Sequence, residues 1–184
     1  MIFKLNNLDT TLMVFLNKTI SNPILDVIMP LITNQNNWTI PIIILIIYLG
    51  GYSGKKGKLL LLLLLISAGL TDYFCAQYLK PMIGRVRPSH SIADIINVIV
   101  PKGGQYSSPS NHAANSFSAA TIFSFYFSKY KNIFYALSSL IAFSRVYVGV
   151  HYPSDVLFGA LIGMLISMLV LSTYSSIIIK KIKN

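Results

Sequence analysis

The apolar residues of this chain are gathered in long runs that recur along its whole length. A transmembrane helix needs about 20 predominantly apolar residues, with roughly 17 at the short end. The strongest candidates cover residues 59–78, 113–127, 133–148 and 156–179. Two weaker runs, at residues 39–52 and 24–33, bring the predicted number of spans to six, although the second is short and contains Pro30 and Asp26.

A further apolar pattern precedes these runs. The apolar side chains of residues 8–16 fall on roughly one face of a helix: Leu8, Leu12, Met13, Phe15 and Leu16. Such a segment is typical of a helix that lies in the membrane interface. The whole pattern predicts an all-α, polytopic membrane bundle of about six transmembrane helices plus an N-terminal interfacial helix. We expect it to form a single domain over residues 1–184.

Composition supports a membrane protein. Hydrophobic residues make up 54% of the chain and charged residues only 11%, whereas a soluble domain carries about 25% charged residues. All five acidic residues are Asp, and so few carboxylates argue against a two-metal site. The net charge of +10 suits anionic headgroups or phosphate substrates. Because the basic residues sit at helix ends rather than in one patch, nucleic acid is not expected as a partner. No cofactor, no metal and no obligate protein partner is expected either.

The distribution of lysine predicts how the bundle is oriented. When six spans alternate in direction, most lysines fall on one side: Lys55, Lys56, Lys58, Lys129, Lys131, Lys180, Lys181 and Lys183, joined by Lys4 and Lys18 from the amino-terminal segment. The positive-inside rule makes this side cytoplasmic. The uncharged loop at residues 34–37 and the long loop at residues 81–111 are then expected on the outer side.

The long outer loop has an apolar middle section: Ile92, Ile95, Ile96, Val98, Ile99 and Val100. Two interpretations are open. In the favoured one the section rests on the bilayer surface, since buried loop tips are common. In the other it forms a lid over an entrance for lipid.

Residues with catalytic chemistry collect at the outer ends of the predicted spans. All three histidines lie on that side, and charged groups near a membrane core are costly and usually functional. Three clusters stand out: Lys80 to Pro88, Pro109 to His112, and Ser144 to Asp155. Taken singly, each has a simpler interpretation: headgroup-binding cations, a helix cap beside an interfacial histidine, and an interfacial ion pair.

Taken together, the clusters resemble the three-part signature of the type 2 phosphatidic acid phosphatase superfamily. That signature reads Lys-x6-Arg-Pro, Pro-Ser-Gly-His and Ser-Arg-x5-His-x3-Asp, and its order and internal spacings match over residues 80–155. The one departure is Asn111, which occupies the glycine position of the second motif. Glycine there would allow a positive φ or a close approach of backbone to phosphate, and asparagine is the next most tolerant of left-handed geometry.

The resemblance implies a metal-free phosphatase and a role for each motif residue. His151 would attack phosphorus, Asp155 would fix its tautomer, and His112 would protonate the leaving oxygen and then activate water. A further set would hold the phosphoryl oxygens: Lys80, Arg87, Ser110, Asn111 and Arg145.

Four other polar residues have smaller expected roles. Arg85 either touches a headgroup or second phosphate, or is solvated at the surface. Asp72, inside a predicted span, is expected to support a motif arginine. His90 and Lys102 are expected on the surface of the long loop.

The resemblance also implies a lipid substrate, because the site would open at the outer edge of the bilayer. Among substrates of small bacterial envelope members, lipid A 1-phosphate and undecaprenyl pyrophosphate are favoured, with phosphatidylglycerophosphate as a further candidate. The protein is then expected in the bacterial inner membrane, with its site facing the periplasm. One alternative is a related haloperoxidase that holds vanadate, which the long apolar spans disfavour. The other is a non-catalytic lipid or phosphate binder, or a transporter, that retains the motif, although no inverted repeat is visible.

Overall fold

The computed structural model describes the backbone of residues 2–183 and the side chains of residues 7–176. This part of the chain is all-helical, apart from one isolated antiparallel bridge between Val86 and Tyr106. The longer helices are α1 (Ile2–Val14), α2 (Pro23–Thr33), α3 (Gln35–Ile47), α4 (Gly54–Tyr73), α7 (Asn111–Tyr126), α8 (Lys131–Tyr147) and α9 (Pro153–Lys183). Short helical segments complete it: η1 (Phe15–Thr19), η2 (Tyr48–Tyr52), η3 (Phe74–Leu79), α5 (Lys80–Ile83), α6 (Pro88–Ser91), η4 (Ala93–Ile95) and η5 (Ser128–Tyr130). The all-α prediction is confirmed.

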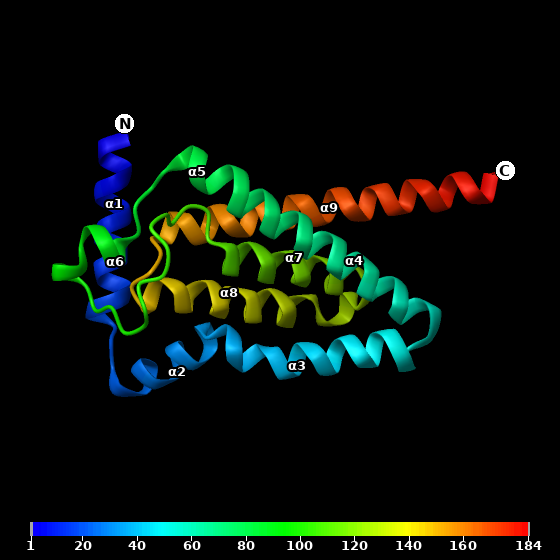
Figure 1. The fold of residues 1–184 in the computed structure, drawn as a ribbon, viewed down its shortest axis with the longest axis horizontal. Helices are drawn as coiled ribbons and strands as arrows, with labels where there is room; N and C mark the ends of the chain where they lie inside the picture. The colour runs from blue at the N-terminus through cyan, green and yellow to red at the C-terminus, as the bar shows by residue number, and fades with distance from the viewer. Residues whose placement is uncertain (1, 184) are drawn as a thin grey trace.

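Two helical stretches are long and apolar enough to cross a bilayer by length and composition, Gly54–Ile83 and Pro153–Ser176. The helices Asn7–Thr19 and Pro23–Thr33 would add a third only as one bent unit, because they meet at 116°. α7 and α8 run alongside the long helices in Figure 1 but are shorter, at 16 and 17 residues. The count of six transmembrane helices stays a prediction.

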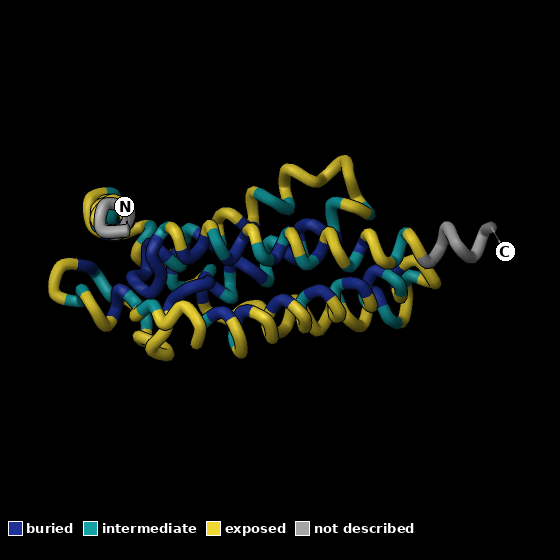
Figure 2. The backbone as a smooth tube through the Cα atoms, turned by 90° about the horizontal axis from the view of Figure 1, so that it is seen from above, coloured by how far each residue is buried: buried dark blue, intermediate teal, exposed yellow. Residues whose placement is uncertain are grey.

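The outer surface of the bundle is apolar. On α9, the stripe Leu157, Leu161, Leu165 and Leu169 is between 54% and 68% exposed. Figure 2 shows the buried positions inside the bundle and at the end that carries the loops. An apolar exterior of this extent is unfavourable in water and favourable in lipid, so the chain is a membrane protein.

The path of the chain through α2 and α3 differs from the prediction. Only Asn34 separates them, and its side chain accepts a hydrogen bond from the N–H of Asn36 at the start of α3. Antiparallel helices need a connection of about 2–5 residues, so this one is too short to reverse the chain. Figure 1 accordingly shows α2 and α3 following one another along one side of the bundle. The prediction of an outer loop at residues 34–37 between two crossing spans is wrong.

The predicted path of the chain also misplaces the amino-terminal segment. Figure 1 shows α1 lying across the end of the bundle where α9 begins, opposite the turn between α3 and α4. η1, which carries Lys18, lies at the same end of the bundle as α1, because its Asn17 donates to the carbonyl of Tyr147 at the end of α8. The prediction that Lys18 lies on the side of Lys55 is therefore wrong. Four lysines of the orientation argument have side chains outside the described residues: Lys4, Lys180, Lys181 and Lys183.

Helix α1 turns its apolar face outward. Leu8, Leu12 and Phe15 are 58%, 42% and 48% exposed. The buried face of α1 and η1 carries Met13, which packs in the same cluster as Ile96, together with Asp9 and Asn17. The amide of Asn17 donates to two backbone carbonyls, those of Asn97 and Tyr147. Apolar side chains on the outer face are expected of a helix in contact with lipid.

The apolar section of the long loop packs mainly inward. Ile96 is buried, and Ile92 and Val98 pack against the same hydrophobic cluster. Ile95 and Ile99 remain 47% and 37% exposed. Neither a surface segment nor a lid describes the packed half, because those side chains form part of the core between the loop and α1.

Candidate active site

The starts of α7 and α9 are held together at the loop end of the bundle. Gly159 and Gly163 of α9 lie so close to the carbonyl oxygens of Ser110 and Ala114 that a Cβ at either glycine would clash. The backbone N–H of Ser110 also donates to the carbonyl oxygen of Asp155 at 3.0 Å. This close packing brings the second motif against the third.

The first motif reaches the second through a short piece of strand pairing. Around the Val86–Tyr106 bridge, the N–H of Ser107 donates to the carbonyl of Arg85 at 2.8 Å. The ammonium group of Lys80 donates to the carbonyl of Pro109 at 2.9 Å. The long loop therefore lays the two motifs side by side, although about 20 residues separate them in the sequence.

His151 enters the site from the turn after α8. Gly149 begins this turn with a φ of +88°, which side chains rarely permit, and a Cβ there would also meet the carbonyl oxygen of Asn97. The imidazole of His151 is buried, and its Nε2 atom lies 3.0 Å from Nη1 of Arg87. Its Nδ1 atom lies 3.7 Å from Oδ2 of Asp155. The histidine thus stands between a cation and a carboxylate.

Burial lowers the pKa of the His151 imidazole far below its ordinary value of about 6.5. The contact with Asp155 opposes this shift, whereas the positive charges of Arg87 and Arg145 add to it. A neutral imidazole keeps a lone pair available for attack, as a nucleophile requires. The 3.7 Å separation from Asp155 is longer than a hydrogen bond, and such contacts often tighten only when substrate binds.

Two further predicted residues come from α7 and α8. His112 is the second residue of α7, and the charges of Arg145, Arg87 and Lys80 all act on it. Arg145 lies near the end of α8 and donates from Nη1 to the hydroxyl of Thr33 in α2. The structure therefore brings the three motif cations and both motif histidines into one site.

Buried polar atoms without a protein partner gather in this site. Six of the ten such side-chain atoms in the described residues belong to the predicted set: Arg87 Nε, Ser110 Oγ, Asn111 Oδ1, His112 Nε2, Arg145 Nε and His151 Nδ1. Buried polar groups in folded proteins are nearly always hydrogen-bonded. Donors from two guanidinium groups, a hydroxyl and an imidazole suit an oxyanion with several acceptor oxygens, such as phosphate.

Comparison with known proteins identifies the family. The sequence profile of the PAP2 superfamily matches residues 58–178. The chain belongs to the PAP2 superfamily. It is 34% identical over 171 residues to the lipid A 4′-phosphatase of Bacteroides thetaiotaomicron, a match that covers 89% of this chain and 75% of the relative.

Two crystal structures resemble this PAP2 protein closely. Aquifex aeolicus LpxE superimposes with a TM-score of 0.71 and 28% sequence identity, over 90% of this chain and 95% of that one. The first transmembrane PAP2 type phosphatidylglycerolphosphate phosphatase from Bacillus subtilis gives a TM-score of 0.71 and 27% identity, over 95% and 88% of the two chains. The resemblance inferred from the three motifs is confirmed.

The departure of this PAP2 chain from the glycine motif has a structural explanation. Asn111 is the first residue of α7, and none of the described non-glycine residues has a positive φ. Its side-chain amide donates to Oδ1 of Asp72 at 2.8 Å, and Asn115 donates to the same oxygen at 3.0 Å. Left-handed geometry is therefore not what Asn111 supplies. The expectation that Asp72 supports a motif arginine is wrong, because its partners are these two asparagines.

Three residues around the motifs were missed or left open by sequence reasoning. Thr33 accepts from Arg145, and Asp9 and Asp155 both bind Arg85. Both terminal amines of Arg85 are thus engaged by carboxylates of the protein, and its side chain is 23% exposed. The partners lie between 70 and 112 residues apart in the sequence, so no local pattern could have paired them.

Other predicted residues lie away from the site. His90 and Lys102 are exposed on the long loop, as predicted. Within residues 7–176, no group of three or more His, Cys, Asp or Glu side chains is arranged to hold a metal ion.

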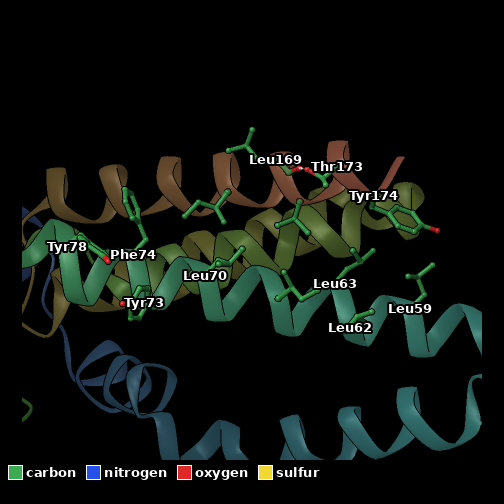
Figure 3. A pocket seen from close by; sticks show the side chains of 13 residues that line it. Leu59, Leu62, Leu63, Leu70, Tyr73, Phe74, Tyr78, Leu169, Thr173 and Tyr174 are labelled. Atoms are coloured by element: carbon green, nitrogen blue, oxygen red, sulfur yellow. Dashed lines mark hydrogen bonds between the residues drawn. The ribbon is translucent and has the colours of Figure 1, made fainter. Parts of the chain in front are cut away.

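An open apolar groove of about 760 Å³ runs between α4 and α9 (Figure 3). None of the predicted site residues lines it, and its walls are almost entirely Leu, Ile and aromatic side chains. Tyr78, two residues before Lys80, marks one end, and Leu59 and Tyr174 mark the other. The groove is therefore separate from the polar site but reaches toward it.

Proposed function

We propose that this protein hydrolyses a phosphate ester of a membrane lipid, with lipid A as the first candidate, through a phosphohistidine intermediate on His151. The observation that carries the proposal is the set of unpartnered donors beside a buried, neutral histidine. Phosphoryl transfer depends mainly on positioning and on neutralising the charge of the equatorial oxygens. Three cations and a hydroxyl in one site can supply both.

The residues fit a two-step mechanism. In the first step Nε2 of His151 attacks phosphorus, the bond to the lipid oxygen breaks, and the imidazolium form of His112 gives that oxygen its proton. The negative charge of the bound phosphate offsets the burial and the cations that disfavour this form of His112 in the empty site. Asp155 accepts from Nδ1–H and stabilises the charged ring. In the second step water attacks phosphorus and His112 takes its proton. The nitrogen–phosphorus bond then breaks, which releases phosphate and restores His151.

Three positive groups would hold the phosphoryl oxygens in both steps. Lys80, Arg87 and Arg145 supply the charge, and Ser110 with the first backbone N–H groups of α7 completes the cradle. Asn111 keeps its predicted place in this cradle through its backbone N–H, since its side-chain amide binds Asp72.

The lipid is proposed from two lines of support. The apolar groove between α4 and α9 offers a hydrocarbon chain a path that ends near Lys80. The relative from Bacteroides thetaiotaomicron is named for the 4′-phosphate of lipid A, a position that the motifs alone did not suggest. We therefore rank the 4′-phosphate first, the 1-phosphate and undecaprenyl pyrophosphate next, and phosphatidylglycerophosphate after them.

The site is proposed to face the periplasm from the inner membrane. The lysines at the turn between α3 and α4 and at the turn between α7 and α8, Lys55, Lys56, Lys58, Lys129 and Lys131, lie at the end of the bundle opposite the site (Figure 1). Lysine-rich turns favour the cytoplasm. A periplasmic site follows from that orientation.

Phosphate release by the detergent-purified protein tests this function. The substrates are lipid A with both phosphates, undecaprenyl pyrophosphate, phosphatidylglycerophosphate and phosphatidic acid, each with excess EDTA, and mass spectrometry identifies which lipid A phosphate is lost. We expect release despite chelation, and none from His151→Ala with an unchanged unfolding temperature. No release from any lipid by folded wild-type protein would favour the non-catalytic binder, and full activity in His151→Ala would exclude the mechanism.

A further inference from the structure

Helix α1 meets the candidate active site through the carboxylate of Asp9 and through Met13, which packs in one cluster with Ala113, Tyr152 and Val156. Asp9 is 7% exposed, and its Oδ2 atom lies 2.6 Å from Nη2 of Arg85. The other amine of that guanidinium, Nη1, donates to Oδ1 of Asp155 at 3.0 Å. One arginine therefore bridges an aspartate of the amino-terminal helix and the aspartate that faces His151. Asp9 lies well before residues 58–178, which match the family profile.

The bridge fixes the rotation of the Asp155 carboxylate. With Oδ1 engaged by Arg85, Oδ2 accepts from the N–H of Tyr152 at 2.9 Å and faces His151. Asp155 is fully buried, and a buried carboxylate without a paired cation is strongly unfavourable. Arg85 is the only cation that forms a salt bridge with Asp155 in the described residues.

Asp9 in turn fixes Arg85. The guanidinium of Arg85 lies over the ring of Tyr152, 3.9 Å from its centroid, and is held from the other side by Asp9. The second oxygen of Asp9 accepts from the backbone N–H of Ser154 at 2.9 Å, in the first turn of α9. A carboxylate at a helix N-terminus is favourable, so Asp9 ties α1 both to Arg85 and to the helix that carries Asp155.

We propose that Asp9 and Arg85 are positioning residues for the His151–Asp155 pair. Helix α1 then contributes to catalysis through Asp9, in addition to its contact with lipid. The inference rests on the proposed function, because it assigns the pair a catalytic role. Without Asp9, Nη2 of Arg85 loses its charged partner, and only the contacts of Nη1 with Asp155 and Ser154 and the stacking on Tyr152 remain. The carboxylate of Asp155 then loses the orientation that holds the imidazole for attack.

The first test compares kinetic constants on phosphatidic acid or lipid A. Asp9→Asn keeps the shape and the acceptor for Ser154 but removes the charge, and we expect kcat to fall about 10-fold to 50-fold with KM changed less than about threefold. Asp94→Asn is the matched control, since Asp94 is exposed and lies on the long loop at the same end, and it should keep wild-type kcat. Wild-type kcat in Asp9→Asn, or an equal loss in Asp94→Asn, would overturn the proposal.

The second test asks whether Asp9 acts through Arg85. Residues that work as one unit give non-additive losses, so Asp9→Asn/Arg85→Ala should be no slower than Arg85→Ala within about twofold. Free guanidinium chloride at millimolar concentration should restore part of the kcat of Arg85→Ala, and much less when Asp9 is also replaced. A merely structural defect would not respond to guanidinium. Multiplying losses in the double variant, or equal rescue with and without Asp9, would contradict the coupling.

A third measurement separates this inference from the proposed function. If the wild-type protein hydrolyses none of the lipids, that function fails, and thermal unfolding of the same variants in detergent still decides the coupling. We expect the losses in unfolding temperature from Asp9→Asn and Asp155→Asn to be non-additive when Arg85 is present and additive in Arg85→Ala. Additive losses in both backgrounds would rule out positioning through Arg85.

Discussion

Nη1 of Arg87 lies 3.0 Å from Nε2 of His151, the ring nitrogen that does not face Asp155. A guanidinium can only donate, so this nitrogen is the acceptor and carries no proton. The arrangement places a positive charge beside the atom proposed to bind phosphorus. When phosphate enters, its oxygens can take over the hydrogen bond from Arg87 and leave the lone pair of Nε2 free to attack.

Replacing Arg87 should therefore reduce the stabilisation of the transition state more than it reduces the stability of the fold. We expect Arg87→Ala to lower kcat about 100-fold to 1,000-fold, the range seen when one oxyanion donor is removed. Arg87→Lys should recover only part of this loss, because an ammonium group is a point charge without the planar fork. Steady-state phosphate release measures both. An Arg87→Ala variant within about threefold of wild type would contradict a role at the phosphoryl group.

Acid should destabilise the protein through His151. Because its pKa in the folded state lies below the unfolded value of about 6.5, the unfolded chain takes up this proton first as the pH falls. The free energy of unfolding then falls by up to about 1.4 kcal/mol per pH unit below pH 6.5, and is unaffected well above it. We expect the unfolding temperature to fall less in His151→Gln than in wild type when the pH is lowered from 7.5 to 5. Equal losses in both proteins would show that His151 titrates normally.

The asparagine in the glycine position should be replaceable by the family residue. Asn111→Gly removes one hydrogen bond to Asp72 but relieves no strain, because the residue already has a helical backbone with negative φ. We expect phosphatase activity within about threefold of wild type, and a stability loss of about 1–2.5 kcal/mol from the hydrogen bond and the glycine together. Thermal unfolding and phosphate release test this together. A 100-fold loss of activity would mean that the Asn111 side chain itself contacts the substrate.

The contribution of Thr33 to kcat should come from its hydroxyl group alone. It accepts from Nη1 of Arg145 and is itself buried, and an unpartnered donor on a buried cation is costly. Thr33→Val keeps the shape but removes the acceptor, and we expect kcat to fall about 10-fold. Thr33→Ser keeps the hydroxyl and should stay within about twofold of wild type. Similar losses in the two variants would point to packing rather than to the hydrogen bond.

The site was predictable from sequence because its chemistry lies in three short motifs with fixed spacings. The backbone devices that assemble it are also local: Gly149 turns the chain before His151, and Gly159 allows α9 to approach α7. The structure brings the residues of the three motifs to one end of the bundle, with the side chain of Asn111 turned to Asp72. Their roles in binding and catalysis stay predictions.

The supporting contacts and the path of the first helices were not predictable in the same way. Asp9 and Arg85 are 76 residues apart in the sequence, and Thr33 and Arg145 are 112 apart. Neither pair therefore forms a local motif that the sequence could reveal. Periodicity did find the apolar residues of the first helix, but it did not show that Leu8, Leu12 and Phe15 would be exposed while Met13 is buried beside the polar Asp9. The relative direction of α2 and α3 depends on the single residue between them, Asn34. A hydropathy profile does not show that a connection is too short to reverse the chain.

The central claim is that His151 carries the phosphoryl group, and trapping that group tests it most directly. Wild-type protein is mixed with lipid labelled with ³²P in its phosphate, in excess EDTA, quenched in alkali within milliseconds, and digested for mass spectrometry. We predict an alkali-stable, acid-labile label on His151 that turns over at the rate of phosphate release and is absent from His151→Ala. Phosphate release with no labelled protein, or a label on another residue, would contradict the account.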